Sequence, residues 1–214
     1  MVRPSKPELE FFTESGKKIT VGATSGVKIW ENQTDEETVG YEPAHHWYEF
    51  AYPALMVPPF PPDRMAIIGV GCNIIGKLTQ KIHANEISPG KWEARPMKCD
   101  LVDIDPFPHL ESDETFTLHK MDGIDFLSQF PEDYFDYVAL DPYPVGQLAI
   151  DKRFITKDFS KVMKCAKRWS IALLKSENHN DSWSSAENFL SDWRMQNFKQ
   201  FRAHFVPFFS RRRS

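Results

Sequence analysis

The chain has 214 residues, of which 41% are hydrophobic and 14% aromatic, and its formal net charge is −4. This length suits one domain of ordinary to large size with a sizeable core, and the slight acidic excess argues against a dedicated nucleic-acid-binding domain. Three widely spaced cysteines without a CxxC pair disfavour a disulfide framework and a structural zinc site, and no apolar run reaches about 18 residues. We therefore expect a cytoplasmic protein with no metal, membrane or nucleic-acid partner.

The first part of the chain is polar and rich in short β-prone pieces. "LEFFTES", "KKITVGA" and "GVKIWEN" are separated by glycines, which predicts a small antiparallel β unit. A helix-like apolar face over 44–57 follows, and then the proline-rich connector "PPFPPDR". We therefore predict a β-rich unit over 1–43 and a second domain over 44–214.

From Met65 onward, short apolar runs alternate with helical patterns. The predicted strands are "MAIIGV", "MKCDLVDIDP", "FTLHK", "FDYVALDPYP" and "WSIALLKSE". The first and the fourth are apolar enough to be buried on both faces of a parallel sheet. Helices are predicted in "IIGKLTQKIHANEI", "GIDFLSQF", "ITKDFSKVMKCAKR" and "SSAENFLSDWRMQNF", and "QFRAHFVPFF" closes the chain with strand pieces. Such alternation is typical of a doubly wound, Rossmann-like α/β sheet, here preceded by the small β unit.

The first predicted strand runs into a glycine turn, "GVGCN", which contains Gly69 and Gly71. Ligands of open parallel sheets bind beyond the carboxyl ends of the strands, and glycines let the backbone approach them closely. The turn does not match a dinucleotide fingerprint, since Ile74 replaces the third glycine and the next strand-end acid comes later than about 20 residues on. It is not a phosphate-binding P-loop either, because no Gly-Lys-Ser/Thr follows.

Acidic residues stand at the ends of the next three strands. Asp103 and Asp105 are placed to accept hydrogen bonds from ribose hydroxyls. Asp122, which is followed by Gly123, could accept one from an adenine amino group. Asp141 lies at the mouth of the site, where the chemistry would occur. Each alone also fits an ordinary turn or cap. Together, without a phosphate-binding basic residue, they favour S-adenosylmethionine (SAM) or a close relative, whose sulfonium cation nearby carboxylates stabilise.

These stretches resemble the spermidine synthase-like family of the class I SAM-dependent methyltransferase superfamily. The likeness lies in "WYEFAYPALMVPPFPPDRMAIIGVG", "LVDIDP", "MDGIDFL" and "YFDYVALDPYPVGQLAIDKRFITKDF". It implies that Asp103 holds the ribose, Asp122 the adenine amino group, and that Asp141 is the catalytic aspartate that receives or orients an attacking amine. It also places Glu49 in a substrate-side triplet and implies a small β domain before the cofactor fold and a possible homodimer.

The sequence departs from this family at three places. Cys72 stands where the family has an aspartate for the aminopropyl ammonium of decarboxylated SAM, Tyr48 replaces a Gln or His of the triplet, and the second aspartate after the fourth strand is absent from "DPYPVG". Removal of an acid beside the cofactor tail lowers repulsion of a carboxylate, so full SAM becomes more plausible. Tyr143, also on the substrate side, has two open interpretations, stacking on an acceptor or plain packing.

We therefore predict a transferase that binds SAM or a close relative and alkylates a small-molecule amine, with methyl transfer favoured. Two alternatives remain: an aminopropyltransferase that uses decarboxylated SAM, and a non-catalytic scaffold that keeps the fold.

Overall fold

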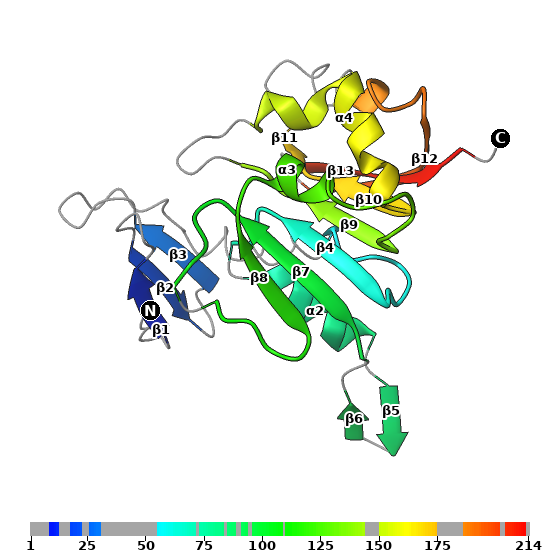
Figure 1. Ribbon diagram of the computed structural model, residues 1–214. Coiled ribbons are helices and arrows are strands. Elements are labelled where there is room, and N and C mark those ends of the chain that lie inside the picture. The colour runs from blue at the N-terminus through cyan, green and yellow to red at the C-terminus, as the bar shows by residue number, and fades with distance from the viewer. Residues whose placement is uncertain are drawn as a thin grey trace.

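The computed structural model describes residues 9–12, 18–22, 26–30, 55–71, 73–83, 85–88, 91–93, 96–108, 110–143, 150–174, 186–201 and 204–212 (Figure 1). Its largest element is a mixed sheet in the order β11-β13-β10-β9-β4-β7-β8, with β12 paired to β13. The strands are β4 (Arg64–Ile68), β7 (Lys98–Asp103), β8 (Phe116–Lys120), β9 (Tyr137–Leu140), β10 (Arg168–Ile171), β11 (Leu173–Leu174), β12 (Trp193–Phe201) and β13 (His204–Arg211).

The five central strands β8, β7, β4, β9 and β10 are parallel, whereas β13 is antiparallel to β10 and β12. All four residues of β9 are buried, as are the last four of β4. A strand buried on both faces carries no polar alternation, which explains the continuous apolar runs in the sequence.

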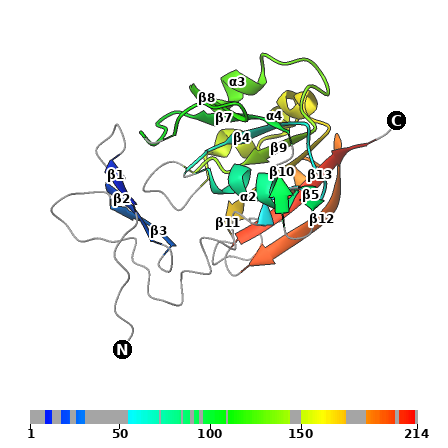
Figure 2. The ribbon, with the colours of Figure 1, turned by 90° about the horizontal axis from the view of Figure 1, so that it is seen from below.

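Two apolar layers cover the two faces of this sheet. Ala66 and Ile68 of β4 pack in one layer with Phe126 of α3 (Gly123–Leu127), and Phe159 of α4 (Lys157–Val162) lies in the same layer. Met65 and Ile67 pack in the other layer, which contains Ile75 of α2 (Ile74–Ile82). Figures 1 and 2 show α2 on the face opposite α3 and α4. The doubly wound α/β fold is thus confirmed.

Shorter elements complete the described residues. Strands β1 (Leu9–Phe12), β2 (Lys18–Gly22) and β3 (Gly26–Trp30) form an antiparallel sheet, as predicted for the N-terminal β pieces. Strands β5 (Asn85–Ser88) and β6 (Lys91–Glu93) form a separate pair. Two 3-10 helices, η2 (Lys152–Ile155) and η3 (Met163–Cys165), flank α4. The domain boundary after residue 43 stays a prediction.

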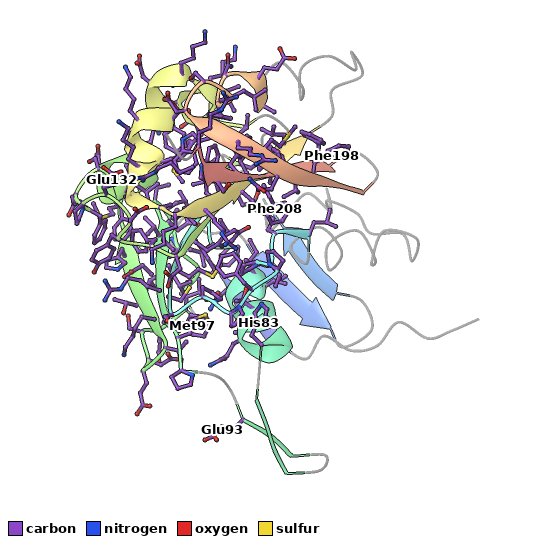
Figure 3. The ribbon with its side chains drawn as sticks, turned by 90° about the vertical axis from the view of Figure 1, so that its right-hand side faces the viewer. His83, Glu93, Met97, Glu132, Phe198 and Phe208 are labelled. Carbon is purple, nitrogen blue, oxygen red and sulfur yellow. The ribbon has the colours of Figure 1, made fainter. Side chains whose placement is uncertain are left out.

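All four predicted helices extend past the helical residues of the structure, and the first and the last differ most. The first helix ends at Ile82, and Asn85–Ser88 form β5. The last predicted helix is wrong in its second half, because β12 begins at Trp193 and pairs with β13 along its length. The Trp193 ring is buried and meets Trp169 edge-on, 5.7 Å away. Figure 3 shows this strand pair with Phe198 of β12 and Phe208 of β13 labelled. Tertiary pairing and burial here override the local helical spacing.

Thr156 is the N-cap of α4, and its hydroxyl accepts a hydrogen bond from the Phe159 N–H at 3.2 Å.

Candidate functional site

The glycine turn after β4 is held against the ends of both neighbouring strands. The Gly69 N–H donates to the Val102 carbonyl of β7 at 2.9 Å, and the Asp141 N–H after β9 donates to the Ile68 carbonyl at 2.7 Å. Gly69 has a φ of +78°, and a Cβ added there would overlap the Asp141 carbonyl oxygen and lie 2.6 Å from its carbon. This close approach requires glycine.

The next residues of the turn have different surroundings. Gly71 has a φ of +51°, but a Cβ added there would meet nothing within 4 Å. Asn73 also has a positive φ, 56°, and is buried, and a Cβ added to Gly76 would overlap its side-chain oxygen. Asn73 therefore packs inside, against the first turn of α2.

Asp103, the last residue of β7, holds the glycine turn against this strand. Its Oδ2 accepts a hydrogen bond from the Val70 N–H at 2.9 Å, and its Oδ1 accepts one from the Asp105 N–H at 3.0 Å. The carboxylate is half-buried at the edge of the sheet, where two backbone donors orient it. A carboxylate oxygen accepts two hydrogen bonds, so both oxygens keep capacity for a ligand hydroxyl.

Asp122 follows β8 and is the N-cap of α3. Its Oδ1 accepts from the N–H groups of Ile124 at 2.8 Å and Asp125 at 3.2 Å, and its Oδ2 accepts from Arg153 Nη2 at 2.8 Å. Partial burial alone would raise its pKa, but the Arg153 hydrogen bond and the two backbone donors lower the pKa of Asp122 below the ordinary value. The carboxylate is therefore an ionised acceptor at neutral pH.

Gly123, the first residue of α3, is buried for a packing reason. A Cβ there would overlap the Ile68 side chain of β4. The missing side chain brings the start of α3 onto the sheet and thereby brings the Asp122 carboxylate to the end of β4.

Arg153, on η2, is a site residue that the sequence analysis missed. It pairs with Asp122 and with Asp151, the N-cap of η2, at 2.8 and 2.7 Å. These two aspartates raise the pKa of Arg153 further, so the guanidinium is always charged. The single available signal was a lone arginine 31 positions after Asp122, and no local pattern connects residues at that spacing.

The residues above meet around a pocket of about 220 Å³ beyond the carboxyl ends of β4, β7, β8 and β9. Its lining residues are Ile68, Gly69, Val102, Asp103, Ile104, Met121, Asp122, Gly123, Pro142, Tyr143, Asp151, Arg153 and Phe154. Ile104 is 71% exposed, which leaves its apolar surface available to a ligand.

The segment after β9 carries Asp141 and Tyr143. Asp141 is half-buried, and its carbonyl accepts from the Tyr143 N–H at 2.9 Å. The Tyr143 hydroxyl donates to the Ala172 carbonyl at 3.0 Å, so this phenol is held to the backbone after β10 while the residue lines the pocket. Both predicted roles of Tyr143, packing and contact with a ligand, remain compatible with this position.

The structure thus brings five of the predicted residues to one pocket, namely Gly69, Asp103, Asp122, Gly123 and Tyr143. Gly71, Asp105 and Asp141 lie on the same strand ends, next to lining residues. Cys72, Tyr48 and Glu49 lie outside the described residues.

Within the described residues there is no group of three His, Cys, Asp or Glu side chains that could hold a metal ion. No helix among them has the length and apolar character needed to cross a membrane.

Comparisons with known proteins agree on the fold. No protein-family model and no curated protein sequence matches the chain. Among solved structures, human methyltransferase-like protein 13 in complex with SAH is 12% identical, with 75% of this chain and 76% of that chain covered and a TM-score of 0.56. A probable spermidine synthase from Corynebacterium glutamicum is 8% identical, with 98% and 81% covered and a TM-score of 0.58.

A spermidine synthase in complex with the transition state analogue AdoDATO is 13% identical to this chain. The alignment covers 96% of this chain and 75% of that one, with a TM-score of 0.56. Because identities this low show the fold alone, the conclusion concerns architecture: the chain has the class I SAM-dependent methyltransferase-like fold, which it shares with solved spermidine synthases.

Proposed function

We propose that the protein is a transferase that binds SAM or a close relative and alkylates an amine, with methyl transfer favoured. The observation that carries this proposal is the meeting of four strand ends at one pocket, with the glycine turn, Asp103 and Asp122 on its wall and Asp141 beside it. Solved structures of the same fold in complex with SAH or AdoDATO support the choice of an adenosyl ligand.

The residues divide between the two ends of a nucleoside. Asp103 accepts hydrogen bonds from the ribose hydroxyls, since its carboxylate is already oriented by the N–H groups of Val70 and Asp105. Asp122 is the acceptor for the adenine amino group, and Gly123 and the Gly69–Gly71 turn let the backbone approach the ligand. Asp105 adds negative charge at the same edge of the sheet.

In the proposed reaction, Asp141 has the central role among the protein's side chains. When bound, the cofactor supplies an alkyl group on a sulfonium centre, which is a good leaving group. The protein aligns the acceptor with that centre and provides a negative local field. Asp141 orients the incoming amine and accepts its proton, while Tyr143, Tyr48 and Glu49 shape the acceptor side.

Aminopropyl transfer from decarboxylated SAM is the second candidate. It is favoured by the coverage of 96–98% of this chain in the matches to spermidine synthases, against 75% for the methyltransferase-like protein. Methyl transfer is favoured by Cys72, because a thiol at that position neither pairs with an aminopropyl ammonium nor repels a carboxylate.

Isothermal calorimetry on the full chain tests the proposal, with SAM, decarboxylated SAM, S-adenosylhomocysteine and methylthioadenosine as ligands. We expect SAM and S-adenosylhomocysteine to bind more tightly than decarboxylated SAM and methylthioadenosine. The reverse order supports the aminopropyltransferase, and no binding by any of the four supports the non-catalytic scaffold. Sedimentation of the same sample tests the proposed homodimer.

A further inference from the structure

The Arg153 guanidinium is fixed by its own short helix before any ligand arrives. Its Nε and Nη2 donate to Asp151 Oδ2 at 2.9 and 2.7 Å, and the Arg153 N–H donates to Asp151 Oδ1 at 2.9 Å. Asp151 is itself attached to the end of β9, since its N–H donates to the Pro142 carbonyl at 3.2 Å. The guanidinium therefore stays at the pocket wall even if its bond to Asp122 is broken.

Unused hydrogen-bonding capacity remains at this wall. A guanidinium has five N–H donors, and the bonds of Arg153 to described residues use Nε and Nη2, whereas Nη1 has no partner among these residues. Asp122 Oδ2 accepts one bond from a described residue, that from Arg153, and a carboxylate oxygen accepts two. A cationic donor and an anionic acceptor are thus adjacent on the wall of the same pocket.

We propose that Arg153 and Asp122 read the edge of the adenine base together. In adenine, the exocyclic amino group is a donor and the adjacent N1 is an acceptor, so Asp122 accepts from the amine while Arg153 Nη1 donates to N1. The exposed Ile104 offers the base an apolar contact in the same pocket. Arg153 is thereby a specificity-determining residue, and this inference rests on the proposed adenosyl ligand.

The 1-deaza analogue of S-adenosylhomocysteine, in which a C–H replaces N1, isolates this contact. We expect calorimetry to show about tenfold weaker binding of the analogue to the wild-type chain, as for loss of one hydrogen bond to a charged group. Arg153→Met removes the donor and keeps much of the apolar stem. It should bind both compounds with nearly equal, weakened affinity. The control Lys152→Met removes the neighbouring exposed cation and should keep the tenfold difference.

Three results overturn the inference. A tenfold difference that persists in Arg153→Met means that another donor, such as a backbone N–H, reads N1. Tighter binding of S-adenosylhomocysteine by that variant means that Arg153 blocks the pocket. The third needs no variant: the 6-oxo analogue, which reverses donor and acceptor, should bind the wild-type chain about 100-fold more weakly, and equal affinity contradicts the reading. Failure of the wild-type chain to bind S-adenosylhomocysteine instead rejects the proposed function itself.

Discussion

Replacing Gly69 by alanine should damage the site through the backbone, and the matched change at Gly71 measures how much. Both glycines have positive φ values, so an alanine at either position bears the left-handed backbone cost of about 1–2 kcal/mol. At Gly71 an added Cβ meets nothing within 4 Å, so the cost ends there.

At Gly69 a second cost is added. The new Cβ would overlap the Asp141 carbonyl oxygen, and the atoms in its way are backbone, which cannot move aside like a flexible side chain. Overpacking of this kind costs about 1–3 kcal/mol. We therefore expect Gly69→Ala to lower the free energy of unfolding by about 2–5 kcal/mol in total, against about 1–2 kcal/mol for Gly71→Ala.

Urea unfolding of the two variants and the wild-type chain, followed by tryptophan fluorescence, gives both values by linear extrapolation. If Gly69→Ala is no less stable than Gly71→Ala, the close approach of the Asp141 backbone to Gly69 is refuted. Ligand binding gives a second comparison, since Gly71→Ala should weaken the binding of the cofactor if the cofactor lies against the backbone of Gly71.

Three other changes test separate parts of the site, and a fourth tests the ion pair of Lys167 with Asp136, which lies before β9. Asp103→Ala should weaken the binding of S-adenosylhomocysteine by about 1–3 kcal/mol, through loss of charge-assisted hydrogen bonds to the ribose, and unchanged affinity in calorimetry removes Asp103 from the site. Asp141→Asn should slow transfer by about 10²–10⁴-fold in single-turnover assays while the cofactor affinity changes little; near-wild-type transfer contradicts its catalytic role. Cys72→Asp should raise the preference for decarboxylated SAM over SAM, and an unchanged ratio places the cofactor tail elsewhere. Partial burial alone would raise the pKa of Asp136, but the hydrogen bond from Lys167 and two backbone donors outweigh it, so this pKa is lowered. The ionised carboxylate therefore stabilises the fold at neutral pH, and this stabilisation is lost as the pH falls below about 4. Asp136→Asn should thus lower stability at pH 7 by up to about 1 kcal/mol and reduce the loss on acidification, and an unchanged acid profile in urea unfolding refutes this.

Several features could be predicted from the sequence because their causes are local. The continuous apolar runs of β4 and β9 report burial on both faces, and this condition is met in few architectures besides a parallel sheet with helices on both sides. In such a sheet the carboxyl ends of parallel strands meet at one edge, so Asp103, Asp122 and Asp141 could be placed near one another from the order of the strands alone.

Other features were decided by contacts between distant parts of the chain. The helical spacing around Trp193 gave way to a strand, because pairing with β13 and burial against Trp169 outweigh a weak local preference. Gly69 was predicted to let the backbone approach a ligand closely, and the structure shows that it also leaves room for the backbone of Asp141. Arg153 had no role in the prediction, since it lies on η2, whereas its partner Asp122 follows β8 and is distant in the sequence. Charge pairing between distant positions leaves no periodicity in a sequence, so only the folded sheet shows that this arginine stands at the pocket.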